Sequence, residues 1–173
     1  MRPGSSEPRR DRPWASPWGA PPAFWPPTPD RRAALTDVYS RVDAALAGVA
    51  DRCRACGRCC RFEAGGVVLF ASALEMAHLV SEAGPPLAED VPPAGPADAA
   101  WRCPYQAGGQ CVARGGRPLG CRTYFCDAQA REAGEGLYSR AFREIRQVAE
   151  KGGGRWWYGP ARVCLAAWGR PGG

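Results

Sequence analysis

The sequence predicts a small α+β domain that is mostly helical and carries short strands and irregular loops. Apolar side chains recur at helical spacing in three segments, near residues 31–51, 72–83 and 136–151. A short apolar run at 67–70, preceded by two glycines, indicates a buried strand. The stretch 101–126 is rich in glycine and cysteine and shows little periodicity, which favours loops over helices.

The chain is long enough for one modest domain, because it has 173 residues. Nine prolines fall within the first thirty residues, which predicts a disordered or polyproline-like arm over 1–29. Aromatic side chains in this arm are candidate docking points on the body or on a protein partner: Trp14, Trp18, Phe24 and Trp25. We expect the single domain to cover 30–168 and a flexible tail to follow at 169–173.

The first two helices have recognisable starts. Asp30 can cap the first, and its apolar stripe consists of Leu35, Val38, Tyr39, Val42, Leu46 and Val49. The second begins at S-A-L-E, in which Ser72 and Glu75 have the spacing of a capping box, and it should end near Gly84.

The second half of the chain offers weaker signals. Five prolines between residues 84 and 100 indicate a loop. Gly108 and Gly109 favour a small hairpin within 101–126. The third helical stripe, over 136–151, stops at three consecutive glycines, and the apolar tail after it should pack back on the body with 155–158 extended.

Composition narrows the classes of function. We expect a cytoplasmic protein without a membrane contact, since no segment has the length of a membrane span and the first thirty residues lack the apolar run of a secretory signal. The net charge of +6 rests on 22 arginines and one lysine dispersed along the chain. Eight thiolates bound to two divalent metal ions would bring this charge to about +2. Nucleic-acid binding by a zinc module therefore ranks lowest among the functions considered.

Eight of the nine cysteines form two groups. They are Cys53, Cys56, Cys59 and Cys60 in the first group, and Cys103, Cys111, Cys121 and Cys126 in the second. In a reducing cytoplasm such a density of thiols indicates bound metal rather than disulfides. The eight cysteines are thus predicted metal ligands, and the bound metal would hold the loops together in a domain whose apolar core is small.

The cysteine count fits two four-thiolate zinc sites, one binuclear site or an iron–sulfur cluster. Neighbouring thiolates are poorly placed on one tetrahedral ion, so Cys59 and Cys60 should serve different metals or different corners of a cluster. The iron–sulfur alternative draws on the C-x2-C-x2-C run at 53–59 and on Cys103-Pro104, which together resemble part of a ferredoxin pattern.

Other reactive residues give no catalytic prediction. His78 is the one histidine, and we interpret it as a core or surface residue rather than a ligand. Cys164 stands apart from both groups and is interpreted as a small buried hydrophobe. The catalytic residues, if the chain is an enzyme, are not identifiable from the sequence.

The two cysteine groups resemble a known family. "CRACGRCC" at 53–60 and "CPYQAGGQCVARGGRPLGCRTYFC" at 103–126 are similar to the motifs of the YkgJ-type cysteine-cluster proteins, described as a zinc- or iron-chelating domain. The match covers about residues 50–130. The resemblance implies a metal-binding domain whose R-P-x-x-C-R unit supplies Arg117 and Arg122 to neutralise the negative charge of a thiolate-bound metal, making them candidate cofactor-binding residues.

Two expectations of function follow. The first is a cytosolic protein that binds zinc or iron through cysteine clusters and has a structural or carrier role. The alternative is an iron–sulfur redox protein, either an oxidoreductase or an electron carrier, in which Cys59 and Cys60 could switch between thiol and disulfide.

Overall fold

A computed structural model describes residues 19–50, 68–86, 102–125 and 127–168. These ranges contain the helices α1 (Pro29–Ala45), α2 (Ala47–Ala50), α3 (Ala73–Ala83), α4 (Leu119–Thr123), α5 (Ala128–Glu150) and α6 (Ala161–Trp168). They also contain the strands β1 (Phe70–Ser72), β2 (Gln106–Ala107), β3 (Gln110–Cys111) and β4 (Tyr158–Pro160). The prediction of a small, mostly helical α+β domain is confirmed at this level.

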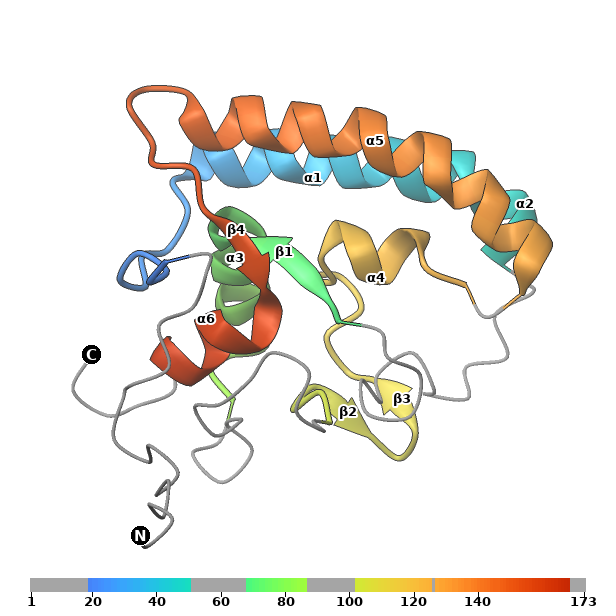
Figure 1. Cartoon of the computed structure of the whole chain (residues 1–173), viewed down its shortest axis with the longest axis horizontal. Coiled ribbons are helices and arrows are strands. Elements are labelled where there is room, and N and C mark those ends of the chain that lie inside the picture. Colours follow the sequence, from blue (N-terminus) through green and yellow to red (C-terminus); the bar gives the residue numbers. More distant parts are fainter. Residues whose placement is uncertain (1–18, 51–67, 87–101, 126, 169–173) are drawn as a thin grey trace, which may run out of the picture.

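The long helices α1 and α5 lie side by side along one side of the molecule (Figure 1). Beneath them lie the shorter helices α3, α4 and α6. The strand β1 pairs antiparallel with β4, with Ala71 opposite Gly159, and β2 pairs antiparallel with β3. The two small sheets are therefore built around turns and helix ends rather than forming a layer of their own.

Two apolar clusters hold these elements together. The first joins α1 to α5 and includes Leu35, Val42 and Ile145, together with Leu119 of α4. The second lies between α3, α6 and the β2–β3 hairpin, and Met76 at its centre is fully buried. Helix α3 lies between the two clusters and packs against both. For this reason all eight consecutive residues from 73 to 80 are buried, and not only one face of the helix.

Helix starts follow the chain's capping residues. The prediction that Ser72 and Glu75 form a capping box is confirmed in both directions. The prediction that Asp30 caps the first helix is wrong: the side chain of Thr28 accepts from the backbone amide of Arg31, and Pro29 takes the first helical position. Proline suits that position because its missing N–H would have had no partner there.

The third predicted helix is longer than its apolar stripe indicated. It begins at Ala128 rather than near residue 136, because Asp127 caps it by accepting from the amide of Ala130 at 3.0 Å. The predicted strand is also shifted, since β1 begins at Phe70. The hairpin at Gly108 and Gly109 is confirmed, and both glycines have the positive φ of a type I′ turn, +56° and +81°.

The described part of the predicted arm, residues 19–29, contacts the body at several points. The indole nitrogen of Trp168 donates to the carbonyl of Pro22 at 2.9 Å, and the rings of Phe24 and Trp168 meet edge to face. Trp25 packs against the second apolar cluster. Trp14, Trp18 and the predicted tail at 169–173 lie outside the described residues.

Candidate metal site

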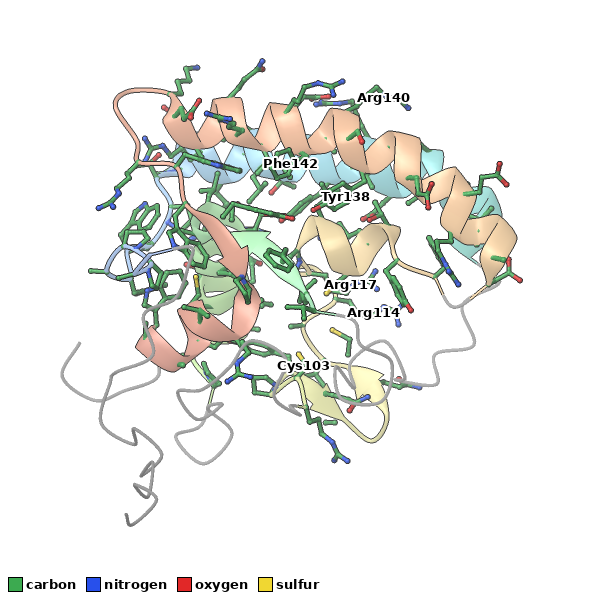
Figure 2. All side chains as sticks on the ribbon, viewed as in Figure 1. Cys103, Arg114, Arg117, Tyr138, Arg140 and Phe142 are labelled. Carbon is green, nitrogen blue, oxygen red and sulfur yellow. The ribbon has the colours of Figure 1, made fainter. Side chains whose placement is uncertain are left out.

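Three of the predicted ligands line one cavity. Its volume is about 560 Å³, and its wall includes Cys103 and Cys111 from the hairpin region and Cys121 from α4. Figure 2 labels three of the lining residues, Cys103, Arg117 and Tyr138. These three cysteines are up to 18 positions apart in the sequence and border the same cavity.

The other predicted ligands lie outside the described residues: Cys53, Cys56, Cys59, Cys60 and Cys126. Among the described ranges no group of three or more His, Cys, Asp or Glu side chains is arranged to hold a metal ion. Val68, the first described residue after 51–67, also lines the cavity. The residue that directly follows this segment in the sequence is therefore part of the same cavity wall as Cys103, Cys111 and Cys121.

The hairpin positions Cys103 and Cys111. The amide of Gln106 donates to the carbonyl of Cys103 at 3.1 Å, and the amide of Val112 donates to the carbonyl of Tyr105 at 2.9 Å. The phenol of Tyr105 donates to the carbonyl of Gly84 at 2.9 Å, which ties the hairpin to the end of α3. These bonds close the turn so that both thiols face the same cavity.

Helix α4 positions Cys121. Pro118 precedes the helix with extended backbone, and the amide of Cys121 donates to its carbonyl at 2.9 Å. Gly120 forms cavity wall next to Leu69, where an added Cβ would lie only 2.8 Å from the Leu69 Cδ1 atom. A glycine beside the cysteine therefore lets α4 approach the strand that follows the first cysteine group.

Arg117 and Arg122 have different surroundings. Arg117 lines the cavity and is half-buried. The guanidinium of Arg122 is 7% exposed and donates to the carbonyl of Arg117 at 2.8 Å, to the carbonyl of Gly115 and to the carboxylate of Asp43. Arg122 therefore ties the loop before α4 to α1. That Arg117 and Arg122 neutralise the charge of a thiolate-bound metal stays a prediction.

Glu75 is a second buried charge beside α4. Its side chain is 2% exposed and accepts hydrogen bonds from Ser72, from the amide of Leu119 and from the phenol of Tyr39. Burial raises the pKa of Glu75, and the hydrogen bonds from Ser72, Leu119 and Tyr39 oppose that rise. Burial and the charge of Glu75 raise the pKa of Tyr39 and outweigh the opposing charge of Arg122, so its phenol stays protonated and donates.

Sequence reasoning identified Glu75 only as a helix cap and did not identify Tyr39 or Asp43 as partners of the cysteine-bearing loop. The S-A-L-E pattern carries a local signal for the bond with Ser72. The bonds from Leu119 and Tyr39 join positions 44 and 36 residues away. One signal was available: Glu75 lies between Leu74 and Met76 on an otherwise mostly apolar helix, and a buried carboxylate needs hydrogen-bond donors from elsewhere in the fold.

His78 and Cys164 lie apart from the cavity wall. His78 is 4% exposed, burial lowers its pKa, and its Nδ1 atom has no hydrogen-bond partner within the described part of the chain. Cys164 is fully buried in the second apolar cluster, and burial raises the pKa of its thiol. Both placements agree with their interpretation as core residues.

Comparison of the chain with known protein families, with curated proteins and with solved structures gave no match. No helix among the described ranges has the length and apolar character to cross a membrane.

Proposed function

We propose that this chain is a cytoplasmic metal-binding protein of the YkgJ cysteine-cluster type, in which the two cysteine groups hold zinc or iron in a structural or carrier role. The observation that supports the proposal is that Cys103, Cys111 and Cys121 all line one cavity. The hairpin region contributes two of these thiols and the short helix α4 contributes the third, and thiolate metal sites are typically built from ligands of more than one segment.

The surroundings of the three thiols support metal rather than isolated thiol chemistry. All three side chains are half-buried, so their sulfurs are within reach of an ion and partly shielded from water. Three thiolates in one cavity would repel each other, and a bound cation removes this repulsion. In this proposal the first cysteine group completes the thiolate site, and Val68, which follows its segment in the sequence, lines the same cavity.

The iron–sulfur alternative differs in its inorganic content and not in its ligands. Both forms would use cysteine thiolates, and a cluster would add sulfide and visible absorption. The described residues carry no feature that separates the two forms, so the experiment has to distinguish them.

The test is elemental analysis of protein purified without oxygen and without a metal-affinity tag, together with acid-labile sulfide and a visible spectrum. Eight thiolates in two tetrahedral sites would give about two zinc per chain and no sulfide. Iron with sulfide and a brown colour would favour the redox alternative. Protein with neither metal, even after anaerobic loading, would contradict the proposal.

A matched pair of variants assigns the metal to the cavity. Cys121→Ser removes a thiol from the cavity wall, and we expect it to lower the metal content. Cys164→Ala removes a thiol that is buried away from the cavity, and we expect it to retain the full content. Equal metal content in the two variants would show that Cys121 is not a ligand.

A further inference from the structure

The short helix α4 carries Cys121 and is held at its first residue by a carboxylate from another helix. The amide of Leu119 donates to the Glu75 Oε1 atom at 2.8 Å. The same oxygen accepts from the phenol of Tyr39 at 3.4 Å. The other oxygen accepts from the amide and the hydroxyl of Ser72, both at 2.8 Å. All four neighbours are donors, so the site requires a group with two acceptor oxygens.

Capping of α3 accounts for only half of these bonds. The capping box uses Glu75 Oε2 and Ser72, both at the start of α3. Oε1 is directed instead to α4 and to Tyr39 of α1. A glutamate that only capped its own helix could lie at the surface, whereas this one is 2% exposed. Its second oxygen therefore serves the contact between α3 and α4.

The far end of α4 has its own anchor. Arg122 donates to the carbonyls of Gly115 and Arg117 and to the carboxylate of Asp43, and its guanidinium lies 4.0 Å from the centre of the Tyr39 ring. Tyr39 thus contacts both anchors, with its hydroxyl toward Glu75 and its ring under Arg122. Cys121 lies between these two anchored ends.

A helix of five residues does not persist without tertiary support, because too few backbone bonds compensate for its nucleation. We propose that Glu75 is a positioning residue for the metal site: it fixes the start of α4 and thereby holds the Cys121 thiol at the cavity wall before metal binds. The assignment of a metal to that wall rests on the function proposed above. The fixing of α4 by Glu75 does not, and it is measurable in metal-free protein.

The decisive variant is Glu75→Gln, with Ser72→Ala as its matched control. Glutamine keeps the shape of the side chain but replaces one acceptor oxygen with an NH₂ group, which would face donors. Ser72→Ala removes the hydroxyl half of the capping box and leaves the bond between Glu75 and Leu119 in place. The pair separates weakening of the α3 cap from release of α4.

The first measurement is amide hydrogen exchange of reduced, metal-free protein in the segment 118–124. We expect exchange there to be about tenfold faster in Glu75→Gln than in wild type and unchanged within about twofold in Ser72→Ala. Unchanged exchange of this segment in Glu75→Gln would overturn the inference, as would an equal increase in both variants. This measurement does not depend on whether the protein binds metal.

The second measurement is a cobalt(II) titration followed by thiolate-to-cobalt charge-transfer absorption. We expect Glu75→Gln to bind cobalt about 10- to 100-fold more weakly than wild type, with an altered band shape, and Ser72→Ala to bind like wild type. Identical titrations for wild type and Glu75→Gln would overturn the positioning role. Absence of charge transfer in wild type itself would instead contradict the proposed function, and the exchange experiment would still decide the inference.

Tyr39→Phe keeps the experiment decisive if Glu75→Gln does not fold. It removes only the hydroxyl bonded to Glu75 and keeps the ring under Arg122. We expect a smaller increase in exchange of 118–124, about threefold. No increase in that variant would overturn the inference.

Discussion

At the scale of single residues, burial decides the chemistry of His78. Its imidazole lies on α3 with its ring centre 5.9 Å from that of Tyr39, and the described charges that act on it are Glu82, Arg32 and Arg122. Burial lowers its pKa, the two arginines lower it further, and Glu82 opposes them. A neutral imidazole in this position is consistent with an Nδ1 atom that has no partner among the described residues.

We expect His78 to make the fold acid-sensitive. Because the folded-state pKa is lower than the unfolded value of about 6.5, the unfolded chain takes up the proton first as pH falls. Its contribution to stability is therefore complete above that value and is lost as pH falls through the folded-state pKa. The measurement is the melting temperature of wild type and His78→Leu between pH 8 and pH 5 at equal metal content. Wild type should lose more stability on acidification, and parallel curves would contradict this.

Cys164 provides a second residue-level prediction, on thiol reactivity. The nucleophile is the thiolate, so burial that raises the pKa of a thiol also slows its alkylation. In chelator-treated, reduced protein we expect Cys103, Cys111 and Cys121 to react with iodoacetamide at least about tenfold faster than Cys164. Mass spectrometry of timed samples measures each site, and a Cys164 that reacts at the rate of the other three would show that α6 is not packed as described.

At the scale of elements, caps and turns that depend on neighbouring residues were predictable from the sequence. Close contacts between helices that are distant in the chain were not. The capping box of α3 and the Gly108-Gly109 hairpin depend on neighbouring residues, and both predictions are confirmed. The first turns of α5 were missed because Gly134 and Gly136 weaken the helical signal. Gly134 is required by a tertiary contact, since an added Cβ would overlap the carbonyl oxygen of Thr123 in α4.

The two glycines should respond in opposite ways to alanine. Gly134→Ala must push α5 away from α4, and we expect it to destabilise the fold by about 1–3 kcal/mol. Gly136→Ala has no atom within 4 Å of the new Cβ, and we expect it to stabilise by about 0.5–1 kcal/mol, because alanine favours a helix interior. Urea unfolding of both variants at equal metal content measures the difference. Stabilisation by Gly134→Ala would show that α4 and α5 are not in close contact.

At the scale of the whole molecule, the sequence predicted that metal organises the second cysteine group, since 101–126 lacks periodicity. The structure adds contacts that the sequence could not indicate. Leu119 and Phe125 of this stretch belong to the apolar cluster between α1 and α5, and Glu75 and Arg122 anchor α4 from both ends. These contacts join residues far apart in the chain, so no local pattern records them. The hairpin before α4 has weaker support, because its strands have two residues each.

The cysteine-bearing stretch should therefore respond to metal removal in two parts. After chelation we expect amide exchange to accelerate strongly in the hairpin segment 103–112, where bound metal would supply the missing support. We expect much less change in 119–125, which the core and its two anchors hold. Exchange measured before and after chelation, with zinc added back as the control for reversibility, compares the two segments in one molecule. Equal loss of protection across 103–125 would mean that metal, and not the buried Glu75 and Arg122 contacts, organises α4; retention in both segments would mean that metal has no part in holding the hairpin.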